Sequence, residues 1–137
     1  MKTIIEQNRK VVDTFFVALE TQNFELLNEV FAEKGRQLNP YVPEGFPKIF
    51  DGRVAIYKQY SSLPASFGEM KFPRTIYATE NPNFFFVVFQ GDIAIKAGGK
   101  YQNEYIGTFK VENNQIVEYT EYFNPIVMAK AFGIELK

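Results

Sequence analysis

Residues 101–123 read YQNEYIGTFKVENNQIVEYTEYF, a stretch in which polar, aromatic and branched side chains alternate. A period of two is typical of strands with one buried face, and Glu-Asn-Asn at 112–114 predicts the turn of a hairpin. Each strand carries one polar residue, Asn103 or Glu121, on a face otherwise made of rings and branched carbons. A carboxylate among aromatic rings is costly unless something uses or satisfies it. Glu121 is therefore the first candidate for function, and it suggests a pocket in place of a plain core.

Apolar residues at steps of three and four predict three helices before the hairpin, over 4–20, from 24 to Gly35, and over 54–63. Gly35 is expected to cap the second helix at its C-terminus, because glycine adopts the conformation of that position without strain. Asp51 is expected to cap the free amides at the start of the third helix. The prolines between these two helices exclude regular structure until about residue 50.

Two further strands are expected between the third helix and the hairpin. Residues 69–79 form one of them, in which Pro73 marks an edge or a bulge. Residues 84–95 begin with FFFVVF, which is apolar on both faces and predicts a central strand covered on each side. Gly91 within it is a candidate bulge. A short helix over 125–132 is expected to follow the hairpin.

The order of elements is three helices, four long strands in antiparallel succession, and a helical tail. This order predicts an α+β domain, and 137 residues suffice for one hydrophobic core. Helices packed on one face of a curved sheet leave a funnel between the two layers. The funnel is the expected place for a pocket.

The composition limits the partners of the chain. Aromatic residues make up 17%, with 15 Phe and 8 Tyr, which suits either the lining of a cavity for a flat hydrophobic or aromatic small molecule or a Phe-rich core. A net charge of −1 without a Lys/Arg stripe gives no support for nucleic-acid binding. No long apolar run, secretory leader or lipidation motif is visible, so we expect no membrane association and a cytoplasmic location.

The chain contains neither Cys nor His. This excludes disulfides, thiol nucleophiles, Ser-His couples and His-based metal sites. The acidic residues lack the spacing of a calcium loop, and no phosphate-binding or dinucleotide glycine pattern occurs. We therefore expect no metal and no cofactor, and any catalysis must come from Glu, Asp, Tyr, Lys, Arg and amides.

Several segments, in this order of elements, resemble the nuclear transport factor 2-like superfamily, and within it the SnoaL-like and ketosteroid isomerase-like branch: Phe-Ala-Glu at 31–33, Phe-Asp-Gly-Arg at 50–53 and Glu-Tyr-Phe-Asn-Pro at 121–125. The resemblance covers nearly the whole chain. A narrower resemblance to the phenazine biosynthesis A/B proteins lies within residues 72–134 and is carried by residues 79–87, 101–106, 121–125 and 130–134.

The resemblance implies one SnoaL-like domain over residues 1–137. Its fold would be cystatin-like: a cone-shaped, curved, mixed or antiparallel sheet with the three N-terminal helices on its concave face. It also implies a buried pocket at the wide end and a homodimer through the sheet. Members of the superfamily include isomerases, polyketide cyclases, dehydratases and non-catalytic binding modules, so the fold alone does not decide the activity.

The steroid isomerase pattern requires a Tyr in the first helix, an Asp base after the second helix and a second acid on a later strand. By the resemblance these positions fall at Phe15, Asn39 and Asn103. An amide does not abstract a proton at neutral pH, so the standard steroid isomerase mechanism is not expected. The phenazine pattern uses an acid in the last strand, matched by Glu121, and a His on the central strand, which falls at Phe84.

Each candidate residue has two interpretations. Glu121 is either a general acid/base with its pKa raised by burial or a carboxylate satisfied by Arg, Tyr or backbone amides. Asn39 and Asn103 either bind a ligand or tie a loop to the sheet. The remaining candidates for the lining are aromatic, and any one of them is as readily a core residue: Phe15, Tyr41, Tyr57, Phe84, Tyr105 and Tyr119.

Two functions remain open. The first is an enzyme, a lyase, isomerase, cyclase or condensation enzyme that uses Glu121 on a planar ketone, with Asn39 or Asn103 polarising the carbonyl. The second is a non-catalytic module that binds or carries a hydrophobic small molecule. A purely dimeric structural role is a third, weaker option.

Overall fold

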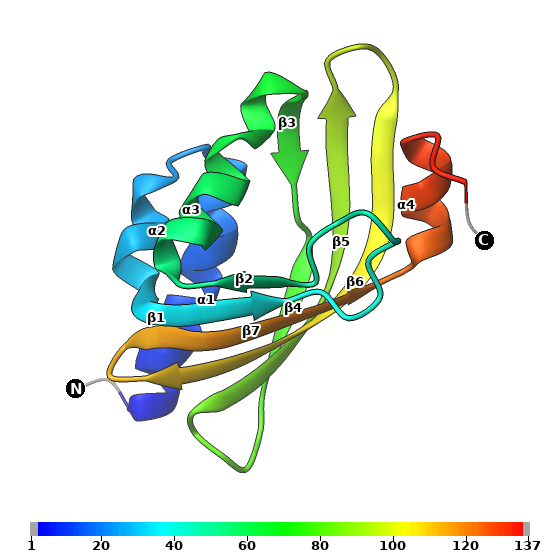
Figure 1. Ribbon diagram of the computed structural model, residues 1–137. Helices are drawn as coiled ribbons and strands as arrows, with labels where there is room; N and C mark the ends of the chain where they lie inside the picture. Colours follow the sequence, from blue (N-terminus) through cyan, green and yellow to red (C-terminus); the bar gives the residue numbers. More distant parts are fainter. Residues whose placement is uncertain (1–2, 136–137) are drawn as a thin grey trace.

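A curved, mixed sheet of seven strands wraps around three helices in this computed structural model, which describes residues 3–135 (Figure 1). The helices are α1 (Ile4–Glu20), α2 (Glu25–Val30), α3 (Arg53–Ser61) and α4 (Pro125–Ala131), with a 3-10 turn at Leu63–Ala65. The strands are β1 (Phe31–Leu38), β2 (Ile49–Asp51), β3 (Phe67–Lys71), β4 (Arg74–Ala78), β5 (Phe84–Ile95), β6 (Lys100–Glu112) and β7 (Gln115–Phe123).

The strands follow the order β2-β1-β7-β6-β5-β3, and β4 also pairs with β5. All neighbouring pairs are antiparallel except β1 and β7, which run parallel. Helices α1 to α3 lie on the concave side of the sheet, and α4 lies beside β6 at its far end (Figure 1). The α+β fold with N-terminal helices on a curved mixed sheet, expected from the sequence, is confirmed.

Helix α1 has the bounds expected from its apolar spacing. Thr3 caps it by accepting a hydrogen bond from the Glu6 amide at 3.1 Å. Its buried face includes Phe15 and Phe16, whose rings pack edge to face 5.0 Å apart and against rings of the sheet. This helix therefore covers the core on the concave side of the sheet, and its Phe15 and Phe16 line the cavity of the candidate site.

The hairpin of β6 and β7 also agrees with its prediction. Asn113 and Asn114 both adopt positive φ, 52° and 62°, which a two-residue turn with the twist of the sheet requires and which Asn tolerates. By contrast, the predicted strand over 69–79 is interrupted at Pro73 into β3 and β4, which both pair with β5.

Three local predictions are wrong. Gly35 does not end a helix: α2 stops at Val30, and Gly35 lies within β1, where a Cβ would come within 2.9 Å of the Ile116 carbonyl oxygen on β7. Asp51 belongs to β2, and Gly52 takes the cap position of α3 without a side-chain bond. Gly91 is no bulge, since it pairs in register with Asn103.

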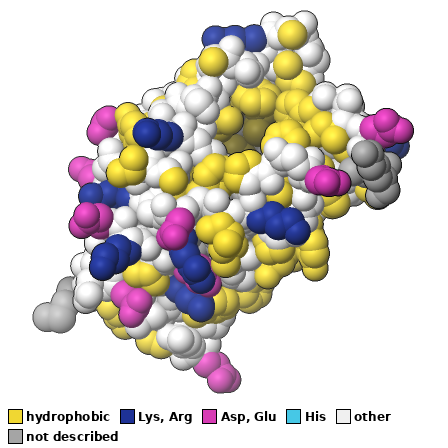
Figure 2. All heavy atoms as spheres, in the orientation of Figure 1, with side chains coloured by type: hydrophobic (Ala, Val, Ile, Leu, Met, Phe, Trp, Pro, Cys, Tyr) yellow, Lys and Arg dark blue, Asp and Glu magenta, His cyan; other side chains and the backbone are white. Residues whose placement is uncertain are grey.

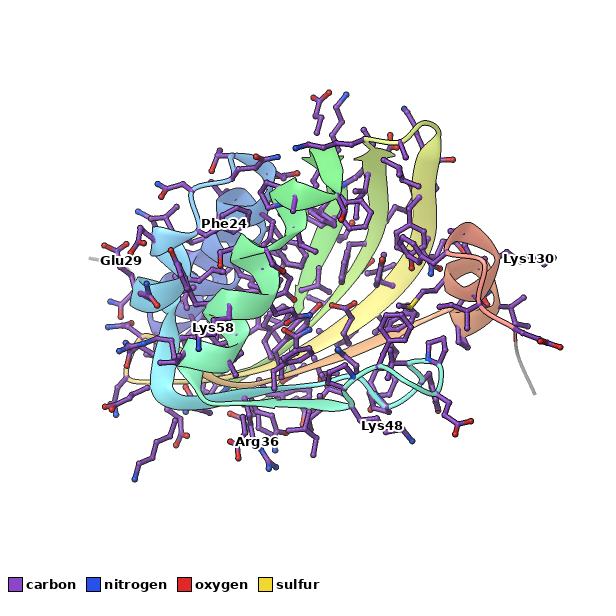
Figure 3. All side chains as sticks on the ribbon, turned by 45° about the horizontal axis from the view of Figure 1, so that its top comes forward. Phe24, Glu29, Arg36, Lys48, Lys58 and Lys130 are labelled. Carbon is purple, nitrogen blue, oxygen red and sulfur yellow. The ribbon has the colours of Figure 1, made fainter. Side chains whose placement is uncertain are left out.

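The outer face of the sheet, away from α1 to α3, is only partly covered. Alternation places Val87 and Phe89 inside, but it leaves Val88 45% exposed on the outside, so the prediction that β5 is covered on both sides is wrong for this chain alone. Charged side chains such as Arg36 and Lys130 also point away from the body (Figure 3). No helix within residues 3–135 has both the length and the apolar character to cross a membrane.

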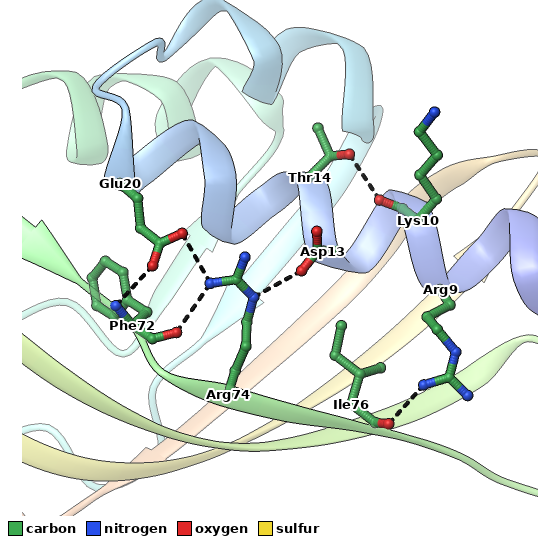
Figure 4. Close-up of polar contacts among 8 residues, drawn as sticks. All are labelled: Arg9, Lys10, Asp13, Thr14, Glu20, Phe72, Arg74 and Ile76. Atoms are coloured by element: carbon green, nitrogen blue, oxygen red, sulfur yellow. Dashed lines mark hydrogen bonds and ion pairs between the residues drawn. The ribbon is translucent and has the colours of Figure 1, made fainter.

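Arg74 connects the sheet to α1 through a partly buried set of polar contacts (Figure 4). Its guanidinium donates to Asp13 at 2.8 Å, to Glu20 at 2.9 Å and to the Phe72 carbonyl at 3.0 Å. It also lies 5.0 Å from the centre of the Phe16 ring. Arg74, the first residue of β4, therefore ties this strand to α1.

Candidate functional site

A cavity of about 910 Å³ opens between the helices and the wide end of the sheet. Figure 2 shows it as a hollow rimmed mostly by hydrophobic side chains. Phe15 and Phe16 contribute from α1, Tyr60 from α3, and Phe89, Tyr105 and Tyr119 from the sheet. Such a volume and lining suit a drug-sized apolar molecule oriented by a few polar groups.

Glu121 supplies the carboxylate of the cavity wall. It lies near the end of β7 on the inner face, and its Oε2 accepts a hydrogen bond from the Tyr119 hydroxyl at 2.8 Å. Its side chain keeps some accessible surface because it borders the cavity, while protein surrounds it on the other sides. The second carboxylate oxygen has no hydrogen-bond partner within residues 3–135, and no arginine pairs with this group.

Burial raises the pKa of the Glu121 carboxyl from a usual value near 4.5 to about 7, against the smaller lowering effect of the Tyr119 hydrogen bond. A carboxyl with this pKa exchanges protons readily near neutral pH. Both interpretations of Glu121 offered by the sequence therefore apply in part. Tyr119 satisfies one carboxylate oxygen, and the other oxygen is left for the cavity.

Tyr119 is held in place by the sheet beneath it. Its ring stacks on Phe109 at 4.4 Å and 15°. It also lies so close to Gly107 that a Cβ there would meet a ring carbon at 2.7 Å. Burial and then the neighbouring Glu121 raise the pKa of the Tyr119 hydroxyl well above its usual value, so this group remains a proton donor.

Asn39 lines the same cavity as Glu121. In the parallel pair of β1 and β7, Gln37 is opposite Tyr119 and Leu38 is opposite Thr120; Asn39 directly follows Leu38, and Glu121 directly follows Thr120. Both side chains line the cavity. Neighbouring strands are about 4.8 Å apart, which brings the amide and the carboxylate within reach of one small ligand.

Sequence reasoning missed Gln37, which is 1% exposed and connects Asn39 to α3. The Tyr60 hydroxyl donates to Gln37 Oε1 at 2.9 Å, and Gln37 Nε2 donates to Asn39 Oδ1 at 3.1 Å. The alternation that marks Glu121 also marks Gln37 in β1 and Asn39 directly after it. Only a few residues separate Gly35 from Pro40, too few for this alternation to be distinctive in the sequence. Gln59, also missed, borders the cavity, and its Oε1 is buried without a partner among the described residues.

Tyr105 lines the cavity as predicted, and its ring lies flat on Phe89 at 4.7 Å and 3°. Gly91 makes this possible, since a Cβ there would meet the Tyr105 ring at 2.8 Å. Burial and then the Glu121 charge raise the pKa of Tyr105 far above its usual range. Phe15, Asn39 and Tyr119 complete the predicted residues that line the cavity beside Glu121.

Four predicted residues do not line this cavity, and their placement there is corrected. Asn103 ties the chain together by bonding the Tyr101 hydroxyl at 2.7 Å and the Asn124 carbonyl at 3.0 Å. Tyr41 is 58% exposed, with its ring 5.6 Å from that of Tyr122. The other two also face elsewhere: the Tyr57 hydroxyl donates to Glu25 at 2.8 Å, and Phe84 pairs with Lys110 on the outer face.

The donor set of the cavity is suited to organic ligands. Among residues 3–135, no group of three or more His, Cys, Asp or Glu side chains could hold a metal ion. The polar groups of the wall are one carboxylate, two amides, several tyrosine hydroxyls, two serines and Lys96. This arrangement allows proton transfer at Glu121 and hydrogen bonding to a carbonyl at Asn39.

Comparison with known proteins agrees with this architecture. YesE of Bacillus subtilis, itself uncharacterised, is 35% identical over 96 residues, which is 69% of this chain and 65% of YesE, just under two thirds of that relative. The phenazine biosynthesis protein PhzA1 of Pseudomonas aeruginosa is 29% identical over 132 residues, 93% of this chain and 81% of PhzA1. A Bacillus subtilis structure provisionally named an isomerase aligns with a TM-score of 0.87 and 27% identity, over 98% of this chain and 99% of that one.

More distant structures show the fold alone. An NTF2-like protein of Burkholderia xenovorans aligns with a TM-score of 0.75 and 19% identity over 92% of this chain and 95% of its own. A protein of Catenulispora acidiphila with a ketosteroid isomerase-like fold aligns with a TM-score of 0.75 and 13% identity over 91% and 93%. The family model of the SnoaL-like domain matches residues 12–119. The resemblance expected from the sequence is thus confirmed, and the chain belongs to the SnoaL-like family with an NTF2-like fold.

Proposed function

We propose that this protein catalyses acid/base chemistry on a planar, ketone-type small molecule, such as an intermediate of secondary metabolism, bound in the cavity. Glu121 would be the group that moves the proton. The observation that carries the proposal is a carboxyl with a pKa near 7, open on one oxygen to a cavity walled by rings. Isomerisation, cyclisation and condensation all require such a proton transfer.

The chemistry needs only the groups present in the wall. Glu121 removes a proton from the carbon next to a ketone carbonyl: the C–H bond breaks, an O–H bond forms on the carboxyl, and the electron pair moves to the carbonyl oxygen as an enolate. The carboxyl then returns the proton to another atom. Such assistance accelerates a reaction by about two to four powers of ten.

The relatives support this class of reaction without naming the substrate. One is named for phenazine biosynthesis and another, provisionally, as an isomerase. A chain without histidine must perform the proton transfer with Glu121 and a tyrosine, water or the substrate itself. The reaction is therefore expected to differ from the phenazine pattern, in which a histidine assists the acid, and the replacements at Phe15, Asn39 and Asn103 separate it from the standard steroid isomerases as well.

A second candidate function is non-catalytic binding or transport of a hydrophobic molecule. It is favoured by Phe15 and Asn39, which line the cavity at the positions where the isomerase pattern places a tyrosine and a base. Under this alternative, the ligand would leave the cavity chemically unchanged.

A homodimer through the outer face of the sheet is part of the proposal. Tyr77, Val88, Ile106 and Tyr122 are between 37% and 48% exposed there. Val88, Ile106 and Tyr122 form one row across β5, β6 and β7. Contiguous exposed apolar side chains of this kind mark interaction surfaces. The cytoplasmic location stays a prediction.

Deuterium exchange tests the catalytic proposal without knowledge of the natural substrate. Methyl naphthyl ketone is planar and carries exchangeable protons beside its carbonyl, and NMR in heavy water follows their loss. We expect the protein to accelerate the exchange and Glu121→Gln to abolish the acceleration. Binding without accelerated exchange would favour the carrier function. Native mass spectrometry of the freshly purified protein would report a retained ligand and the mass of the assembly together.

A further inference from the structure

We infer that the buried chain Tyr60–Gln37–Asn39 fixes the Asn39 side chain with its amide N–H toward the cavity, which makes the site selective for ligands with a carbonyl-type acceptor beside Glu121. Gln37 and Tyr60 are then positioning residues, and Asn39 determines specificity. This inference rests on the proposed function and names the substrate feature that the same site recognises.

The chain has one consistent direction of hydrogen bonding. Tyr60 donates to Gln37 Oε1 at 2.9 Å, and Gln37 Nε2 donates to Asn39 Oδ1 at 3.1 Å. All three residues are buried, at 6%, 1% and 6% exposure. Since the Asn39 oxygen is already occupied, its NH₂ group is the end of the chain. Within residues 3–135 this NH₂ group has no acceptor, and Asn39 borders the cavity.

The Tyr60 proton decides the direction. If both amides were turned over, Gln37 would present its NH₂ group to Tyr60, and the Tyr60 proton would lose its acceptor inside the protein. An unpaired buried donor is unfavourable, so the observed direction is preferred. Tyr60 also cannot lose the unpaired proton by ionising. Burial and then the Glu121 charge raise the pKa of its hydroxyl well above the usual value.

The register of the sheet places this donor where the proton transfer needs it. Asn39 directly follows Leu38, the last residue of β1, which pairs with Thr120 on the parallel strand β7 one position before Glu121, and both Asn39 and Glu121 border the cavity. A ketone whose oxygen accepts from Asn39 presents the adjacent carbon to Glu121. The same N–H would stabilise the negative oxygen of an enolate more strongly than the neutral carbonyl.

The site prefers ligands with an acceptor because a ligand without one leaves the Asn39 N–H unpaired. A ligand of the same shape without the acceptor would cover the Asn39 N–H and leave it without a partner. Sites that use a hydrogen bond in this way discriminate strongly against such analogues. For one neutral donor we expect a preference of about tenfold.

Two probes of nearly the same shape test this inference. One is methyl naphthyl ketone labelled with carbon-13 at its carbonyl, and the other is isopropenylnaphthalene, in which a CH₂ group replaces the oxygen. We expect the wild type to bind the ketone about tenfold more tightly. The carbonyl resonance should move downfield on binding, because a hydrogen bond withdraws electron density from the carbon.

The variants separate positioning from simple packing. Asn39→Leu should abolish both the preference and the downfield shift. Tyr60→Phe and Gln37→Leu should reduce both, since Asn39 is then free to turn, and a purely structural role would not move the carbonyl resonance. Gln115→Leu is the matched control: its amide donates to the Glu29 and Phe31 carbonyls, and it does not line the cavity. If Gln37→Leu fails to fold, Tyr60→Phe decides the question.

The outcomes distinguish the two levels of the proposal. Equal binding of both probes without a downfield shift, combined with Glu121-dependent exchange, would overturn this inference and leave the proposed function intact. A shift that persists in Tyr60→Phe and Gln37→Leu would show that neither residue positions Asn39. A ketone that binds with the downfield shift but never exchanges would contradict the proposed catalysis alone. Absence of binding for both probes would overturn both.

Discussion

The Tyr119 hydroxyl donates a hydrogen bond to Glu121 at 2.8 Å from two residues away on the same strand. The bond stabilises the charged carboxylate and lowers its pKa, while burial raises the pKa by a larger amount. The resulting value of about 7 means that both protonation states are populated near neutrality. Burial therefore raises the pH at which Glu121 changes between acid and base, and Tyr119 limits that rise.

Tyr119→Phe is expected to raise the pKa of Glu121 above the value in the wild type. The ring and its packing on Phe109 remain, and only the donor to the carboxylate is lost. A carbon-13 NMR titration of the Glu121 carboxyl measures the pKa directly. If Glu121 acts as a base, the rise of the exchange rate with pH should move to higher pH by the same amount.

Tyr57→Phe provides the matched control for this titration. Its hydroxyl also donates to a glutamate at 2.8 Å, but the partner is Glu25 and the bond lies outside the cavity. The Glu121 titration should be unchanged in this variant. An unchanged or lowered Glu121 pKa in Tyr119→Phe would contradict the role given to the hydrogen bond.

Glu121→Gln should make the fold more stable at neutral and alkaline pH. The folded-state pKa is raised from near 4.5 to about 7, so the folded chain holds the proton more tightly than the unfolded chain. Below pH 4.5 both states are protonated, and the carboxyl has no effect on stability. Between these values the wild type loses stability as the pH rises, by about 3 kcal/mol in full above pH 7.

Chemical denaturation at pH 4 and pH 8 measures the difference, which should be small at the lower pH and favour Glu121→Gln at the higher one. Glu118→Gln is the control, since Glu118 pairs with Arg36 and Lys110 at the surface. A wild type as stable as Glu121→Gln at pH 8 would show that the carboxylate is better solvated than its surroundings indicate.

Local patterns predicted most elements of the fold. Helix α1 and the hairpin of β6 and β7 carry their own periodicity and their own cap or turn residues. The end of α2 could not be predicted in this way. Phe31 leaves the helix because it pairs with Ile116, 85 positions later in the chain, and no local residue records this contact. The sequence likewise presents Gly35 as a helix cap, although the residue lies in β1, where its lack of a side chain admits the Ile116 carbonyl oxygen of the neighbouring strand.

In the candidate site, too, local patterns predicted some residues, while long-range contacts decide the positions of others. Glu121 was predictable because a charge on a strand face of rings is unusual wherever the strand lies. Tyr41 and Tyr57 carry no comparable signal, since a tyrosine suits a rim, a core or a surface equally well. Their positions depend on the path of the loop after β1 and on the rotation of α3. That Asn39 and Glu121 border one cavity depends on the parallel register of β1 and β7, which only the assembled sheet defines.

Gly107→Ala is expected to destabilise the fold and to disturb the carboxylate together. The new Cβ would lie 2.7 Å from the Tyr119 ring, which Phe109 prevents from moving away. We expect a loss of about 1–3 kcal/mol, typical of overpacking, and a change in the Glu121 titration. In Gly68→Ala the new Cβ would meet Ala94 at an ordinary 3.6 Å, so that variant should behave as the wild type. Equal stability of the two variants would contradict this account.

Arg74→Met should cost about 2 kcal/mol of unfolding free energy, since it removes the contacts to Asp13 and Glu20 while keeping a side chain against Phe16. The Arg74 side chain is only 16% exposed, so water does not replace its partners freely. Arg36→Met is the surface counterpart: its side chain is 47% exposed beside Glu118, and the loss should be within about 0.5 kcal/mol. Urea denaturation of both variants tests the contrast.

Ile106→Lys should convert the proposed dimer to a monomer. Ile106 is 48% exposed in the middle of the row formed with Val88 and Tyr122. In a symmetric interface one substitution introduces two charges, and each would lose its water on association. Val54→Lys is the control, because Val54 is 66% exposed on α3, away from this face. Analytical ultracentrifugation distinguishes the mass of the dimer from that of the monomer. The proposal requires that the wild type and Val54→Lys are dimers. It also requires that Ile106→Lys is a monomer that still unfolds cooperatively. A monomeric wild type, or a dimer that survives Ile106→Lys, would rule out this face as the interface.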